Sequence, residues 1–123
     1  MDAARKAELK SAYKNRRTRA GVFQIVNKKN GKRLIRSGAD VDGLMKRLRM
    51  EFMGGANPFY TQLQQDWNTE GEEAFSFEVL ELVEKQEEKT AIELNGELAD
   101  LEKRYLEKYQ PYGDKGYNRK PIM

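Results

Sequence analysis

Residues 21–38, GVFQIVNKKNGKRLIRSG, constrain the fold of this chain more than any other segment. Phe23 and Ile25 share one face of an extended run, and a second extended run follows a turn. Asn30-Gly31 lies between the two runs, and this dipeptide tolerates the positive φ angles that a tight hairpin turn requires. The sequence therefore predicts two antiparallel strands joined at Asn30-Gly31.

The rest of the chain shows helical patterns and one further strand pattern. Asp40 is the expected N-cap of a helix whose apolar residues recur at helical spacing. Asn57 and the proline after it predict the start of a second helix. Residues 75–82 alternate as a strand does, and a long helix is expected from about residue 86 to 109. Trp67 and Phe77 should lie in the core.

These elements predict an α+β fold, a three-stranded antiparallel sheet flanked by helices. Residues 3–17 add a basic helical pattern before the sheet. We therefore expect an N-terminal extension at 1–20, a domain at 21–118 and a tail at 119–123. The chain has no long apolar run and no signal-like start, so a soluble, cytoplasmic protein is expected.

The composition limits the chemistry that this chain can perform. Its 123 residues include no cysteine and no histidine. Thiolate metal sites are therefore excluded, and the commonest general base and zinc ligand are missing. Any catalysis would use carboxylate, Tyr, Lys or Arg side chains, and any metal would be a hard cation such as Mg²⁺.

Charge is distributed unevenly along the chain. Residues 1–50 carry fifteen Lys and Arg against four Asp and Glu, or +11, whereas the remainder carries −8. A basic half is typical of a surface that meets phosphates, although the two halves could instead neutralise each other. The basic half predicts contacts with DNA or RNA phosphates that depend little on sequence. The residues expected to make them are Arg16, Arg17, Arg19, Lys28, Lys29, Lys32, Arg33, Arg36, Lys46, Arg47 and Arg49.

Several motifs resemble the GIY-YIG nuclease family. The hairpin carries GVF at 21–23 and LIR at 34–36 in the places of GIY and YIG. LQQDWNTEGEEAFSFEVLE at 63–81, the helix ELADLEKRYLEKY at 97–109 and the closing GYN at 116–118 follow in the family's order. The resemblance covers most of the chain and implies the family's fold, a sheet and helices that build one shallow site.

The resemblance also implies where a site would lie. In the family, a Mg²⁺-bound carboxylate holds the scissile phosphate, while tyrosines and an arginine activate water and stabilise charge. Glu102 matches the metal-binding glutamate, and Asn118 matches a late asparagine for which we expect a mainly structural use. Arg47 is a substitute for the family's arginine, although it points about 60° around the helix from the matching position.

Five positions depart from the family's pattern. Phe23 and Leu34 stand in the places of two tyrosines, and Arg36 stands in the place of a glycine. Leu44 replaces an arginine, and Leu48 replaces a frequent histidine. Losing one acid–base group typically costs ~10²–10⁴ in rate, and losing one electrostatic donor costs roughly 10²–10³. The sequence therefore predicts a nuclease fold with impaired catalysis.

Three functions follow from these observations. The first is nucleic-acid binding through the basic surface with little or no cleavage. The second is an active Mg²⁺-dependent nuclease that uses Glu102 together with Tyr60, Tyr112 or Tyr117. The third is a protein-interaction or regulatory module that uses Phe59, Tyr60 and Trp67.

Overall fold

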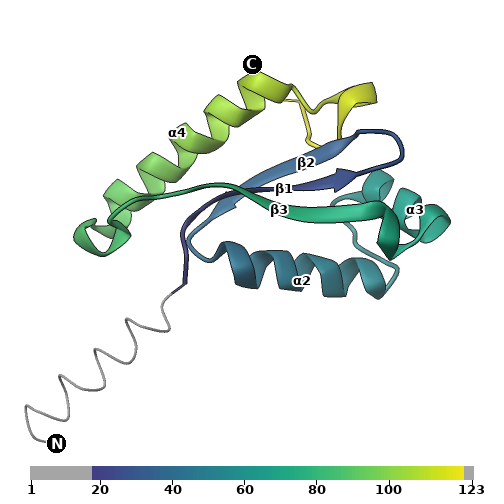
Figure 1. Ribbon diagram of the computed structural model, residues 1–123, viewed down its shortest axis with the longest axis horizontal. Coiled ribbons are helices and arrows are strands. Elements are labelled where there is room, and N and C mark those ends of the chain that lie inside the picture. The colour runs from purple at the N-terminus through teal and green to yellow at the C-terminus, as the bar shows by residue number, and fades with distance from the viewer. Residues whose placement is uncertain (1–17, 121–123) are drawn as a thin grey trace, which may run out of the picture.

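A computed structural model describes residues 18–120 of the chain. The predicted N-terminal helix, with Arg16 and Arg17, lies outside the described residues. The order of the main elements is β1 (Gly21–Asn27), β2 (Arg33–Gly38), α2 (Val41–Met53), α3 (Thr61–Glu70), β3 (Phe75–Leu82) and α4 (Ala91–Tyr109). Figure 1 shows their arrangement. In the part of the chain that the structure describes, no helix could cross a membrane, for lack of a long enough apolar stretch.

The three strands form one antiparallel sheet in the order β2-β1-β3, which confirms the predicted α+β fold. β1 lies in the centre, with Phe23 opposite Arg36 of β2 and Val79 of β3. β2 is therefore an edge strand. No fourth strand covers its outer edge in residues 18–120, where the backbone N–H of Tyr117 donates to the Arg33 carbonyl at 2.9 Å.

The turn between β1 and β2 lies where predicted but is longer than the Asn-Gly dipeptide. The backbone N–H of Asn27 donates to the Lys32 carbonyl at 2.8 Å, so four residues form the loop between them. The side chain of Asn27 accepts from the Lys29 N–H at 2.9 Å, and Gly31 adopts a φ of 77°. Two asparagine side chains in the loop hydrogen-bond to the backbone, which favours a wider turn.

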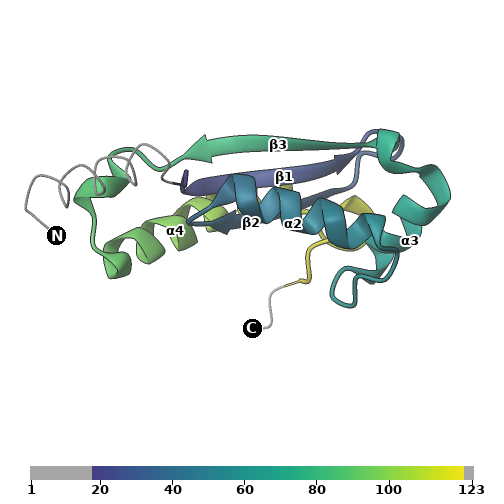
Figure 2. The same ribbon diagram turned by 90° about the horizontal axis from the view of Figure 1, so that it is seen from below.

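Both faces of the sheet are covered, as Figures 1 and 2 show. On one face, α2 and α3 pack over Phe23, Ile25 and Leu34, and Trp67 of α3 belongs to the same buried cluster. Phe77 of β3 is only partly buried and packs against this cluster from outside. On the other face, α4 packs over a second cluster of buried residues that includes Val22, Ile35, Leu98 and Leu101. The strict alternation of side chains along β1 assigns neighbouring residues to opposite clusters.

The helix starts follow local capping chemistry. The Asp40 side chain accepts from the Gly43 N–H at 2.9 Å and caps α2, as predicted. α3 begins only at Thr61, because Asn57 caps a turn before the helix instead of the helix itself. α4 begins at Ala91 behind a capping box between Thr90 and Glu93, later than the predicted start near residue 86.

Candidate nucleic-acid interface

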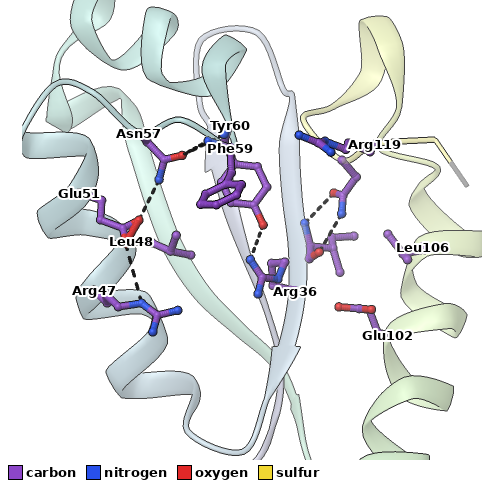
Figure 3. Close-up of a pocket in the computed structure, with 12 residues that line it drawn as sticks. Arg36, Arg47, Leu48, Glu51, Asn57, Phe59, Tyr60, Glu102, Leu106 and Arg119 are labelled. Carbon is purple, nitrogen blue, oxygen red and sulfur yellow. Dashed lines mark hydrogen bonds and ion pairs between the residues drawn. The ribbon is translucent and has the colours of Figure 1, made fainter.

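A pocket of about 590 Å³ lies over the outer edge of β2, between α2 and α4. It collects residues from five separate segments of the chain (Figure 3). Its lining residues are Ile35, Arg36, Arg47, Leu48, Glu51, Asn57, Phe59, Tyr60, Glu102, Leu106, Asn118 and Arg119.

Arg36 lies in the middle of this pocket. It pairs in register with Phe23, so its side chain leaves β2 on the face that α2 covers. Its guanidinium donates a hydrogen bond to the Tyr60 hydroxyl and lies 5.8 Å from the centroid of that ring. This contact orients a partly exposed arginine, because it combines a hydrogen bond with a cation–π arrangement.

α2 contributes a more exposed charge on one wall of the pocket. The side chain of Arg47 is 67 % exposed, and its Nε is 3.9 Å from an oxygen of Glu51. Such a long, exposed i,i+4 ion pair contributes little to stability. Arg47 can therefore turn toward a ligand at low cost.

Two polar side chains hydrogen-bond to the edge strand, one from α4 and one from the C-terminal segment that follows it. Glu102 Oε1 accepts from the backbone N–H of Ser37 at 3.0 Å and from its hydroxyl at 3.2 Å. Asn118 accepts from the Ile35 N–H and donates to the Ile35 carbonyl, both at 2.8 Å. Asn118 thus pairs with β2 as another strand would.

The pocket contains two acidic side chains, Glu51 and Glu102, that could contribute to the expected Mg²⁺ site. Among residues 18–120, no group of three or more acidic, His or Cys side chains could hold a metal. Glu102 offers one carboxylate, whereas Glu51 lies on the opposite wall and accepts from Asn57 at 2.9 Å. This donor set fits only a Mg²⁺ ion that takes its other ligands from substrate phosphates and water, a common arrangement for this cation.

The positions that depart from the family's pattern are divided by the structure. Phe23 and Leu34 have no exposed surface and lie in the core cluster beneath α2. Leu44 packs against the same cluster and lines a separate depression beside Gly38 and Asp40. Leu48 lines the pocket with 3 % of its surface exposed. The structure therefore brings Arg36, Arg47, Leu48, Glu102 and Asn118 together, and leaves Phe23, Leu34 and Leu44 outside the pocket lining.

The other basic residues of the expected surface are dispersed. Arg19 pairs with Asp42 at 2.6 Å, and this hydrogen bond lowers the pKa of the Asp42 carboxyl. Arg33 stacks 4.1 Å from the centroid of the Tyr109 ring on the α4 side. Arg49 lies over Phe77 of β3. The remaining members, Lys28, Lys29 and Lys32 in the hairpin turn and Lys46 on α2, do not line the pocket.

Sequence reasoning missed three contributors to the pocket. Arg119 was assigned to the tail, although a basic residue directly after the GYN motif was a usable signal. Glu51 and Asn57 carried no such signal, because their part in the pocket depends on how α2 and the segment after it pack. Asn57 is 4 % exposed and hydrogen-bonds to Glu51 across that junction.

The tyrosines and the tryptophan of the alternative functions also have defined positions. Tyr60 lines the pocket, and Tyr112 does not. The Tyr117 hydroxyl donates to Asp66 at 2.6 Å, and burial, reinforced by this bond, raises the pKa of Tyr117 to about 12. Tyr117 is therefore a poor general base near neutral pH. Trp67 is 5 % exposed within the core, which confirms its predicted burial and leaves little of it for docking.

Comparisons with known proteins identify the fold. No protein-family model matches the chain, and no curated protein matches it either. The catalytic domain of the homing endonuclease I-TevI, a GIY-YIG enzyme, is similar over 83 % of this chain and 99 % of that domain, with a TM-score of 0.64 and 23 % identity. A mutant of the same domain gives a TM-score of 0.52 at 23 % identity, covering 82 % of this chain and 93 % of that one. At this identity the likeness shows the fold, and it confirms the fold that the motifs implied.

Proposed function

We propose that this chain binds nucleic acid at the pocket over β2 and cleaves it poorly or not at all. The observation that supports this most directly is the pairing of Arg36 with Phe23. At that point of the sheet an arginine faces the pocket, while its neighbour on β1 is buried and carries no hydroxyl. The site thus offers positive charge at Arg36, while the neighbouring position at which the resemblance implies a tyrosine has no hydroxyl.

The charge of the pocket favours a polyanionic ligand. Three guanidinium groups line it, from Arg36, Arg47 and Arg119, against two carboxylates. Arginine forms paired hydrogen bonds with phosphate oxygens, so phosphates are a suitable partner for these side chains. No base-reading motif is evident, and we expect backbone contacts that depend little on sequence.

Cleavage would require groups that the pocket does not supply. Phosphodiester hydrolysis needs an activated water and several donors to the charge that develops. Phe23, Leu34 and Leu44 provide neither, and the losses that such substitutions cause are about 10²-fold or more for each group. Glu102 alone could hold a cation against a phosphate, but this does not replace the base.

To test the proposed binding, the affinity for labelled DNA and RNA oligonucleotides is measured at increasing salt concentrations. Arg47→Gln should weaken binding and reduce the slope of log K against log salt by roughly 0.7–0.9 for a lost phosphate contact. Arg104→Gln is the matched control, because Arg104 is 66 % exposed on α4 and lies outside this pocket. Equal effects of the two substitutions, or no binding at low salt, would contradict the proposal.

A second function, Mg²⁺-dependent cleavage, is favoured by one observation. Glu102 and the Tyr60 hydroxyl line the same pocket, with Arg36 between them (Figure 3). Nicking of supercoiled plasmid DNA in the presence of Mg²⁺ tests it. If the protein nicks DNA and Glu102→Ala abolishes the nicking, the second function replaces the first.

A further inference from the structure

Phe59 is the apolar side chain that the pocket exposes most. It is 67 % exposed at the pocket's rim, next to Tyr60. The other large hydrophobic side chains with comparable exposure in residues 18–120 are Met50, Met53 and Ile92, and none of them lines this pocket. A single exposed phenylalanine is ordinary on a protein surface. Phe59 is unusual because the backbone that carries it is fixed by buried hydrogen bonds.

The backbone that carries Phe59 is fixed by a buried network centred on Asn57. The Asn57 side-chain oxygen accepts from the N–H groups of Phe59 and Tyr60, both at 2.9 Å. Its side-chain amide donates to Glu51, and its backbone N–H donates to Gln64, again at 2.9 Å. Asn57 itself is 4 % exposed. The exposed ring is therefore presented on an ordered segment, which lowers the entropy that a ligand must overcome on binding.

The ring and the arginines together define a ligand. Arg36 contacts Tyr60, the neighbour of Phe59, while Arg47 and Arg119 line the same pocket. A flat apolar surface beside positive charge matches an unpaired nucleotide, whose base can stack on an aromatic ring while its phosphates meet guanidinium groups. In a continuous duplex the bases are already stacked on one another and are unavailable to Phe59.

We propose, on the basis of the proposed function, that the pocket binds single-stranded nucleic acid, with a base stacked on Phe59 and the adjoining phosphates on the pocket arginines. Removing the ring should weaken single-strand binding by about 5- to 150-fold, the effect of losing one base–aromatic stack. Duplex binding should change little, because it would depend on the arginines alone.

The experiment measures fluorescence anisotropy of a labelled oligothymidylate and of a blunt duplex of equal length. The wild type is compared with Phe59→Ala, with Phe59→Trp, and with Ile92→Ala as the matched control, since Ile92 is 85 % exposed at the start of α4 and outside the pocket. We expect Phe59→Ala to weaken single-strand binding selectively, and Phe59→Trp and Ile92→Ala to retain it. The tryptophan of Phe59→Trp should also be quenched when oligothymidylate binds.

The outcomes separate this inference from the proposal on which it rests. If Arg47→Gln weakens binding but Phe59→Ala does not, the pocket binds phosphates without stacking, and this inference is wrong while the proposed function stands. If Phe59→Ala weakens duplex and single-strand binding equally, the preference for single strands is wrong. If neither oligonucleotide binds at low salt, both proposals fail. Urea unfolding of Phe59→Ala should match the wild type and exclude misfolding as the cause.

Discussion

Leu34 and Arg36 lie two residues apart on the same face of β2, and their surroundings are opposite. Leu34 pairs with Ile25 across the hairpin, and both side chains are fully buried beneath α2. Arg36 pairs with Phe23, but its guanidinium reaches the pocket and donates to Tyr60. One strand face thus passes from hydrophobic core to charged surface within a single step of the pleat.

This difference separates stability from ligand binding. On the buried side, each large apolar side chain contributes about 1.5–3 kcal/mol by leaving water. On the open side, polar side chains have specific partners, as in the bonds from Ser37 to Glu102 and between Asn118 and Ile35. We therefore expect buried-side substitutions to lower the free energy of unfolding and to spare binding. Substitutions on the open side should weaken ligand binding and leave the free energy of unfolding nearly unchanged.

The largest expected effect is on the buried side, at Trp67. Its ring lies 5.5 Å from Phe52, 5.0 Å from Phe75 and 6.2 Å from Phe77, measured between centroids. Trp67→Ala should lower the free energy of unfolding by about 3–5 kcal/mol, because it removes a large buried ring and leaves a cavity. Urea denaturation measures this change. A loss below about 1 kcal/mol would mean that α3 contributes little to the core.

A smaller effect is expected where the buried side meets the pocket. Phe23→Tyr places a hydroxyl on a ring that has no exposed surface and lies among apolar side chains. It should cost about 1–3 kcal/mol, the penalty for burying a polar group without a partner. The same urea experiment measures it, and plasmid nicking should stay absent. Unchanged stability would show instead that the Phe23 ring reaches the pocket, and the contrast between the buried surroundings of Leu34 and the open surroundings of Arg36 would be lost.

Much of this fold could be predicted because the signals are local. Alternation defined both faces of β1, Asn30-Gly31 located the turn, and Asp40 capped α2. The prediction that Asn57 caps the second helix was wrong for a physical reason. An asparagine before proline suits a helix start, but here its oxygen accepts from the two N–H groups before α3, while its other polar groups bind Glu51 and Gln64.

The site was harder to predict, because it depends on packing between distant segments. Motif positions located Glu102 and Asn118, but composition could not show that the basic residues would disperse. Part of this follows from strand geometry. Arg33 and Arg36 are three positions apart on β2, so their side chains lie on opposite faces of the sheet. Of the two, Arg36 lines the pocket, whereas Arg33 stacks on Tyr109 on the α4 side.

The smallest expected effect concerns the Tyr117 hydroxyl within the buried cluster, and its pH-dependent part appears only at high pH. Burial and the hydrogen bond to Asp66 raise the pKa of Tyr117 from 10.0 to about 12. The folded state therefore holds this proton more tightly than the unfolded state does. The resulting stabilisation is fully present below pH 10 and is lost as the pH rises through 12.

Tyr117→Phe should thus flatten the decline of the unfolding free energy between pH 10 and 12, besides costing about 0.5–1.5 kcal/mol at neutral pH for the lost hydrogen bond. Tyr105→Phe is the comparison on the α4 side, since the hydrogen bond from Tyr105 to Glu81 also raises the pKa of Tyr105. Urea unfolding at a series of pH values measures both slopes. An unchanged slope in Tyr117→Phe would place the Tyr117 hydroxyl in water, and the cluster beneath α2 would then be open at the end where the GYN motif meets β1.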